Sequence, residues 1–172
     1  MKFNPHEYQK IAIKHIIDHP AAALLLDMGL GKTVITLTAI LYLMKMKMIR
    51  KVLVIAPLRV AKNTWPAEIR KWDHLAGLSY RVAVGNERER RAALSQTAEI
   101  TIVNRESVPW LIEKSGMAFD YDMIIVDELS SFKNGKCKRF MALNQARPRV
   151  KRIVGLTGTP SSNGLRICGP SS

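Results

Sequence analysis

Six short, largely apolar segments, each four to six residues long, recur along this chain of 172 residues; the one at 80–84 alternates, and stretches with helical periodicity separate them. Continuous apolar runs of this length are typical of strands that are covered on both faces of a sheet. Strands that alternate with helices pair in parallel through crossover connections. The sequence therefore predicts one three-layer α/β domain with a mainly parallel sheet, whose strands lie near residues 21–26, 52–56, 80–84, 100–103, 123–126 and 152–156.

Helix signals occur before the first strand and between the later ones. Asn4 is a candidate N-cap, Pro5 suits the first helical turn, and Glu7 can close a capping box. The apolar side chains that follow predict one buried helix face, formed by Ile11, Ile13, Ile16 and Ile17. We expect further helices at about 32–44, 64–72, 87–96, 108–114 and 138–146. Trp65 and Trp72 share a face of one of them, which predicts core packing, with a base-stacking platform as the alternative.

Basic residues outnumber acidic ones by 27 to 14, which gives a formal net charge of +13 at pH 7. Such an excess suits a polyanionic partner, nucleic acid or nucleotide phosphate first, and a solvated basic surface is the simpler alternative. The densest basic stretch, at 136–152, contains no acidic residue and consists of Lys136, Lys138, Arg139, Arg147, Arg149, Lys151 and Arg152 between neutral residues.

Several classes of protein are disfavoured by the sequence. No apolar run approaches the roughly 18 residues that a membrane-spanning helix needs, so we expect no membrane partner. The first residues lack the apolar core of a secretory signal. Cys137 and Cys168 are the only cysteines, too few for a disulfide framework and without metal-ligand spacing. These features predict a reducing, cytoplasmic location.

A glycine-rich segment, Asp27-Met28-Gly29-Leu30-Gly31-Lys32-Thr33, joins the first predicted strand to the following helix. Its glycines let the backbone curl so that N–H groups face phosphate oxygens, and the helix N-terminus adds its positive dipole end. Lys32 would then reach the β- and γ-phosphates of ATP, and the Thr33 hydroxyl would bind Mg²⁺. Leu26 stands where the general pattern has glycine. A turn that only begins a helix is the alternative.

The fifth predicted strand ends in two acidic residues, Asp127 and Glu128. In parallel α/β sheets ligands bind at the carboxyl ends of the strands, so both carboxylates should lie beside the phosphate loop. Asp127 would hold Mg²⁺ through its water shell, and Glu128 would orient or deprotonate the attacking water. Two solvated acids at a strand end are the alternative.

Further motifs accompany these two along the chain. They are Pro5-His6-Glu7-Tyr8-Gln9, then Ala56-Pro57-Leu58 with Trp65, Glu68 and Trp72, then Ile102-Val103-Asn104-Arg105, and finally Leu156-Thr157-Gly158-Thr159-Pro160. In order with the phosphate loop and the acidic pair, they resemble motifs Q, I, Ia, Ib, II and III of superfamily-two helicases. Among these the chain is similar to the Swi/Snf-type DNA-dependent ATPases, particularly their phage and prophage members. Ser130 departs from the His or Asp that often follows the acidic pair.

The resemblance implies a RecA-like P-loop NTPase lobe at 1–165, which binds ATP and Mg²⁺, and a short irregular tail at 166–172. It implies that Gln9 contacts adenine and that Met28, Gly29, Leu30, Gly31, Lys32 and Thr33 surround the phosphates. It also implies that Lys32 and Glu128 are catalytic and that Thr33 and Asp127 bind the metal. Contact with DNA, as a duplex, and coupling to it would fall to Arg59, Lys62, Asn104, Arg105, Thr157 and Thr159.

The motifs of a second RecA-like lobe do not occur in these 172 residues. In the family that lobe supplies an arginine finger, so we expect slow ATP turnover unless a second lobe, such as one on a separate chain, completes the site. A non-catalytic nucleotide- or DNA-binding module is the alternative function. A small-substrate P-loop kinase is a third hypothesis, disfavoured because the sequence offers no lid or substrate pocket.

Overall fold

The computed structural model describes residues 1–27, 31–128, 150–159 and 166–168. Its helices are α1 (Glu7–Asp18), α2 (Lys32–Lys45), α3 (Trp65–Lys71), α4 (Glu87–Leu94) and α5 (Val108–Glu113). Its strands are β1 (Ala21–Asp27), β2 (Val52–Ala56), β3 (Tyr80–Ala83), β4 (Ile100–Asn104), β5 (Met123–Val126), β6 (Arg152–Thr159) and β7 (Arg166–Cys168). A π-helical turn, Val60–Thr64, precedes α3. The helix expected at 138–146 lies outside the described residues.

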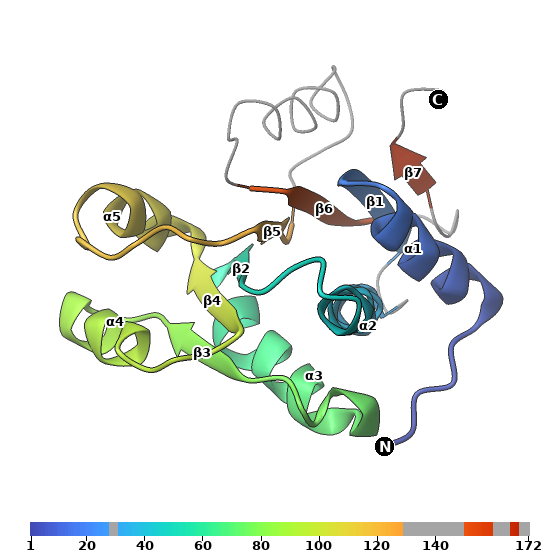
Figure 1. The fold of residues 1–172 in the computed structure, drawn as a ribbon, viewed down its shortest axis with the longest axis horizontal. Coiled ribbons are helices and arrows are strands. Elements are labelled where there is room, and N and C mark those ends of the chain that lie inside the picture. The colour runs from blue at the N-terminus through green and yellow to red at the C-terminus, as the bar shows by residue number, and fades with distance from the viewer. Residues whose placement is uncertain (28–30, 129–149, 160–165, 169–172) are drawn as a thin grey trace.

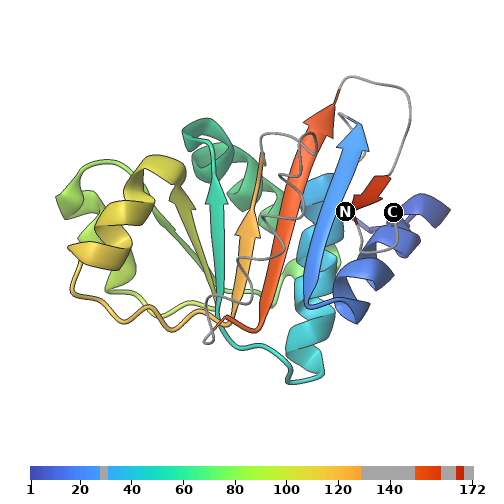
Figure 2. The same ribbon diagram turned by 90° about the horizontal axis from the view of Figure 1, so that it is seen from above.

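The strands form one sheet in the order β3-β4-β2-β5-β6-β1-β7. Strands β1 to β6 pair in parallel, and β7 pairs antiparallel with β1, as the arrows in Figure 2 show. The predicted three-layer α/β fold with a mainly parallel sheet is therefore confirmed. The expectation of an irregular tail from 166 onward was wrong for three residues, because Arg166–Cys168 hydrogen-bond to the free edge of β1.

Helices cover both faces of this sheet, as Figure 1 shows for α2 and α5. Side chains of α1, α2 and α3 pack with alternate residues of the strands, such as Val52 and Val54, in one core cluster. The intervening residues, such as Leu53, face the other way and pack with α4 and α5. Strands buried on both faces explain the continuous apolar runs of the sequence.

Helix α1 begins later than expected. Its N-cap is His6 rather than Asn4, and the His6 N–H donates to Gln9 Oε1 at 2.8 Å. Ile13 and Ile16 are buried as predicted, whereas Ile11 is 54% exposed. Because a helix turns about 100° per residue, Ile11 lies about 200° around the helix from Ile13 and points away from the core.

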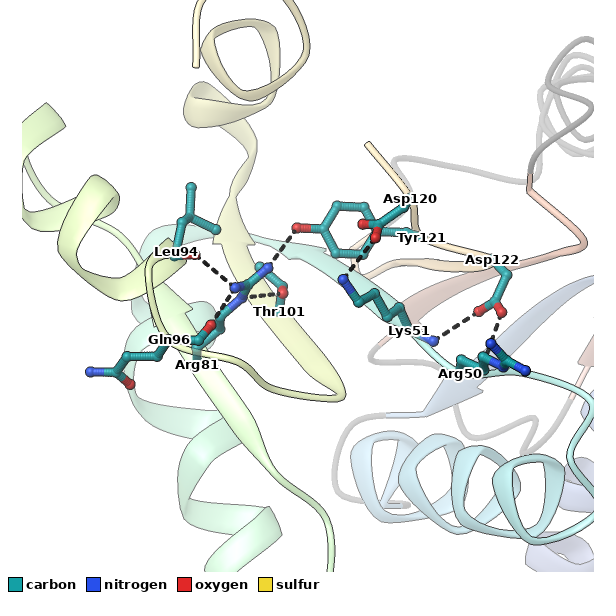
Figure 3. Close-up of polar contacts among 9 residues, drawn as sticks. All are labelled: Arg50, Lys51, Arg81, Leu94, Gln96, Thr101, Asp120, Tyr121 and Asp122. Atoms are coloured by element: carbon teal, nitrogen blue, oxygen red, sulfur yellow. Dashed lines mark hydrogen bonds and ion pairs between the residues drawn. The ribbon is translucent and has the colours of Figure 1, made fainter. Parts of the chain in front are cut away.

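Polar contacts fix the edge of the sheet at the amino ends of the strands (Figure 3). Asp122 accepts hydrogen bonds from the N–H groups of Arg50 and Lys51, at 2.9 and 3.0 Å. The Arg81 guanidinium donates to the backbone oxygens of Leu94 and Gln96 and to the hydroxyls of Thr101 and Tyr121. These bonds tie the ends of β2, β3, β4 and β5 together on the side opposite the predicted site.

The basic stretch at 136–152 lies outside the described residues except at its end. There Arg152 is only 7% exposed, and its guanidinium donates to the oxygens of Ile16 and Ile17 at 3.0 and 2.9 Å. Arg152 therefore anchors the C-terminal end of α1 to β6 and is not a surface cation. Within the described part of the chain no helix is long and apolar enough to span a bilayer.

Candidate functional site

The structure brings three of the predicted site residues together at the carboxyl edge of the sheet. Lys32 begins α2 after β1, and Asp127 and Glu128 follow β5, while β6 lies between those two strands. The Lys32 ammonium lies 3.1 Å from Asp127 Oδ1 and 2.5 Å from Glu128 Oε1. Lys32 thus forms one charged cluster with two residues that lie 95 and 96 positions later in the sequence. This is expected because the carboxyl ends of parallel strands meet at one edge of the sheet.

Asp127 is held rigidly within this cluster. Its side chain is fully buried, and its Oδ2 accepts a hydrogen bond of 2.9 Å from the indole N–H of Trp65. Its backbone N–H donates to Ile55 O at 2.8 Å, which continues the pairing of β5 with β2. Among the described residues, the ion pair with Lys32 is the sole polar contact of Oδ1. One carboxylate oxygen is therefore fixed by the protein and the other faces the site.

The charge of Lys32 depends on the two carboxylates beside it. Burial is the largest single influence on the Lys32 pKa and lowers it. The charges and hydrogen bonds of Asp127 and Glu128 together outweigh burial, so the net pKa of Lys32 is raised above its ordinary value. Lys32 therefore stays protonated at neutral pH and can act as a phosphate-binding cation.

Glu128 adopts an unusual backbone conformation, with φ at 63°, in the left-handed region that non-glycine residues seldom occupy. The guanidinium of Arg105 donates to the backbone oxygen of Asp127 at 2.7 Å and to that of Glu128. These bonds hold the peptide that bends the chain after β5. We expected Arg105 to contact DNA, and its spacing in the sequence gives no sign of this internal role.

Only part of the phosphate loop belongs to the described residues, and Met28, Gly29 and Leu30 lie outside them. Gly31 is the N-cap of α2 with φ at 76°. A Cβ atom at this position would lie 3.1 Å from Gln9 Nε2 and 3.2 Å from Val34 Cγ1. The left-handed conformation therefore favours glycine here, and a Cβ would also press against these two side chains. Thr33, the second residue of α2, is buried.

Gln9, the predicted adenine contact, lies beside a pocket of about 500 Å³. Its side chain is 7% exposed and its Oε1 caps the start of α1. The pocket is formed by the N-terminal segment, by Gly31 and Val34 of the loop and α2, and by Glu68, Lys71 and Trp72 at α3. A pocket of this size is typical of small-ligand sites.

The donor set at the acidic pair fits Mg²⁺. Within the described residues no group of three or more His, Cys, Asp or Glu side chains could hold a metal. Mg²⁺ does not need such a group, because it keeps several waters and binds to one or two carboxylates together with phosphates. Oδ1 of Asp127 is such a carboxylate oxygen: it is buried, and the Lys32 ammonium is its single polar contact among the described residues.

The remaining predicted residues lie near the same edge but make other contacts. Arg59 and Lys62 are exposed after β2, and no carboxylate pairs with them in the part of the chain that the structure describes. Asn104 ends β4, and its side chain bonds to Glu106 and to Ser107, at 2.9 and 2.7 Å. Thr157 and Thr159 belong to β6 rather than to a loop, and Thr157 is buried. Their roles stay predictions.

The fold and this edge define a RecA-like P-loop domain: a mainly parallel sheet between helices, with a lysine at the start of α2 facing an acidic pair that follows β5. Comparison with known proteins gives the family. The sequence model of the SNF2-related domain matches residues 8–167, so the chain belongs to the SNF2-related domain family. This membership shows a helicase-like ATPase domain, as the motifs implied.

Individual relatives agree with this assignment. "Putative protein p41" of Acyrthosiphon pisum secondary endosymbiont phage 1 is 42% identical over 171 residues, 95% of this chain and 37% of that protein. Transcription regulatory protein SNF2 of Saccharomyces cerevisiae is 34% identical over 81% of this chain and 8% of its own length. The Sulfolobus solfataricus SWI2/SNF2 ATPase core, solved in complex with dsDNA, superposes with a TM-score of 0.68 at 28% identity, over 95% of this chain and 34% of that chain. The chain thus spans less than two fifths of each of these relatives.

Proposed function

We propose that the chain is the ATP-binding lobe of a DNA-dependent ATPase of the SNF2 type. The observation that carries this proposal is the cluster of Lys32, Asp127 and Glu128, with the ammonium 3.1 and 2.5 Å from the two carboxylates. The family match supports ATP as the nucleotide. A cytoplasmic location, inferred from the cysteines, stays a prediction.

Each charged residue has a role that its position supports. Lys32 would exchange its two carboxylate partners for the β- and γ-phosphates. Asp127 and Thr33 would hold Mg²⁺, which neutralises charge on the phosphates during transfer. Glu128, which is 41% exposed in its side chain, would accept a proton from the attacking water or orient that water. Gln9, beside the pocket at Gly31, would contact the adenine edge.

DNA would bind at the same edge of the sheet. Arg59 and Lys62 are exposed cations after β2, and backbone phosphates are the groups that such side chains bind. The Sulfolobus relative, whose structure contains dsDNA, makes a duplex the first ligand to test. Thr157 and Thr159 of β6 would relay the state of the nucleotide.

Hydrolysis would need a second lobe. An arginine finger contributes about 10³–10⁵ in rate in related phosphoryl transfers, and the family resemblance places that arginine on the second lobe. We therefore expect this chain to bind Mg²⁺-ATP well and to hydrolyse it slowly. A separate chain is one possible source of the second lobe.

Calorimetric titration of ATP in the presence of Mg²⁺, followed by an ATPase assay with and without duplex DNA, tests the proposal. The wild-type chain should bind Mg²⁺-ATP, and Lys32→Ala should abolish this binding. Lys10→Ala, which removes an exposed lysine of α1, should bind Mg²⁺-ATP as the wild type does. Robust DNA-stimulated turnover by the chain alone would refute the need for a second lobe. Failure of the wild-type chain to bind Mg²⁺-ATP would refute the proposal.

A non-catalytic nucleotide- or DNA-binding module is the second candidate. The ion pairs of Lys32 with both carboxylates favour it in one respect, because they occupy the cation that must bind phosphate. The two candidates separate when a second lobe of a relative is added in trans. Stimulated hydrolysis that Glu128→Gln abolishes indicates the ATPase, and tight binding without hydrolysis indicates the module.

A further inference from the structure

Trp65 occupies a position that core packing alone does not explain. It is the first residue of α3, it is fully buried, and it packs in the cluster between the sheet and α1, α2 and α3. Its indole N–H also donates to Oδ2 of Asp127 at 2.9 Å, across 62 positions of sequence. A buried indole needs a hydrogen-bond acceptor, and here the acceptor is the predicted metal-binding carboxylate.

The turn before α3 determines where this indole points. Val60–Thr64 form a π-helical turn, and the N–H of Trp65 donates to the oxygen of Val60. A π-helical turn holds one residue more than the same turn of an α-helix, so the side chains after it are rotated around the axis. Such turns are frequent at functional sites. The rotation, together with the pairing of β2 with β5, brings Trp65 over the end of β5.

The chemistry of the indole suits a carboxylate that must bind a cation. An indole N–H donates only, so Oδ2 must accept and the carboxylate cannot rotate freely about its Cβ–Cγ bond. The indole carries no charge, so it fixes the carboxylate without competing with a metal ion for its negative charge. A lysine or arginine at this place would neutralise Asp127 instead. Oδ1 is left directed toward the Lys32 ammonium, 3.1 Å away.

We propose that Trp65 is a positioning residue for metal binding: its indole N–H holds Oδ2 of Asp127 so that Oδ1 is aimed at Mg²⁺. This inference rests on the proposed function, because it assigns Trp65 to the Mg²⁺ side of that nucleotide site. It adds a hydrogen-bonding role to a tryptophan that the sequence indicates only as core or as a base platform. Partners that orient a metal ligand in this way typically change metal affinity 10–100-fold when removed.

Trp65→Phe is the test variant, since phenylalanine keeps an aromatic ring in the core and lacks the N–H. Trp110→Phe is the matched control, because the Trp110 indole also donates to a carboxylate, Glu87 Oε1 at 2.6 Å, away from the site. Affinity for a non-hydrolysable ATP analogue is measured by calorimetry in Mg²⁺ and again in EDTA. We expect Trp65→Phe to lower the affinity in Mg²⁺ about tenfold and to leave the affinity in EDTA unchanged. The control should match wild type in both.

A second variant covers the case in which Trp65→Phe fails to fold. Benzothienylalanine at position 65 replaces the indole N–H by sulfur and keeps the shape of the side chain, so packing is preserved and the hydrogen bond is lost. The same selective loss of affinity in Mg²⁺ is expected. In wild type, the indole N–H resonance of Trp65 should shift when Mg²⁺ is added to the nucleotide-bound chain, while that of Trp110 stays in place.

Three results would count against the inference. Equal Mg²⁺-dependent affinities in wild type and in the folded position-65 variants would overturn it and leave the proposed function standing. Equal losses of affinity in Mg²⁺ and in EDTA would show that Trp65 supports the fold only, which also overturns it. If the wild-type chain binds no nucleotide in Mg²⁺, the proposed function fails first and the inference falls with it.

Discussion

Replacing Lys32 by methionine should destabilise the nucleotide-free chain, apart from any effect on ATP. The carboxylate of Asp127 is fully buried, and Lys32 is the one cation within 4 Å of it among the described residues. Methionine keeps most of the apolar stem of lysine and removes the charge. The buried carboxylate then loses its counter-ion and keeps only the hydrogen bond from Trp65.

The magnitude follows from the geometry. Two unit charges 3.1 Å apart attract by about 5 kcal/mol at an effective dielectric constant of about 20. Removing one partner of a buried pair costs about 3–5 kcal/mol, because the other charge stays buried without compensation. The substitution also removes the cost of desolvating the Lys32 ammonium, whose side chain is 22% exposed. We therefore expect a net loss of about 2 kcal/mol in the free energy of unfolding. The contact with the half-exposed Glu128 adds little.

Urea unfolding followed by circular dichroism measures this effect. Thermal unfolding gives a second measurement, in which a loss of about 2 kcal/mol corresponds to a midpoint temperature about 4–8 °C lower for a domain of this size. Lys10→Met is the control, because Lys10 pairs with Glu7 on the surface at 3.9 Å and should change stability by less than about 0.5 kcal/mol. Asp127→Asn completes a double-mutant cycle, in which the double variant should be about 1–2 kcal/mol more stable than the sum of the single effects predicts.

Two outcomes would refute this reasoning. Lys32→Met could unfold at the same urea concentration as wild type, which would mean that Asp127 is solvated or uncharged without its partner. The two substitutions could also have additive effects, which would mean that the ion pair contributes no coupling energy. If the prediction holds, any Lys32 variant used as an ATP-binding control must first be shown to be folded.

Three further predictions concern other contacts. Gly31→Ala should lower stability by about 1–2 kcal/mol in urea unfolding and weaken nucleotide binding, because alanine is strained at φ 76° and its Cβ would meet tightly packed atoms; unchanged values would show that the loop adapts. Arg105→Gln should cost about 1 kcal/mol by the same method, whereas Arg59→Gln should cost nothing measurable, because Arg59 is exposed and pairs with no carboxylate among the described residues. Burial is the main cause of the lowered pKa values of His15 and His74, so the unfolded chain binds protons more readily than the folded chain. The free energy of unfolding should therefore fall as pH drops from about 6.5 to 5. An unfolding free energy that does not change over that range would contradict the lowered pKa values.

The sheet could be predicted from the sequence because most of its strands are nearly continuous apolar runs, and Tyr80–Ala83 belongs to a segment with alternating apolar side chains. Strands β2 and β5 match their predicted ranges of 52–56 and 123–126, and the other four differ by one to three residues at their C-terminal ends. Strand β7 was missed, because three residues on an edge leave no periodic signal. The start of α1 was misplaced because the side chain of Gln9 caps the backbone of His6, a contact that competes with the cap offered by Asn4.

The candidate site could be predicted only as far as strand ends determine it. Lys32, Asp127 and Glu128 meet because parallel strands place their carboxyl ends at one edge. The contacts of Trp65 and Arg105 with the acidic pair could not be predicted. They depend on the register of β4 against β2 and of β2 against β5 and on a π-helical turn, and no spacing in the sequence specifies these.

The charge balance of the site links these observations. In the nucleotide-free chain one ammonium faces two carboxylates, so the formal charges of Lys32, Asp127 and Glu128 sum to −1. A triphosphate alone would displace both carboxylates from Lys32 and meet their repulsion. With Mg²⁺ present, Oδ1 of Asp127 would exchange Lys32 for the metal ion and would stay compensated in its buried position. Mg²⁺ should therefore raise the affinity for nucleotide by more than the neutralisation of phosphate charge alone would. Loss of the Trp65 hydrogen bond to Asp127 should reduce this Mg²⁺-dependent gain in affinity.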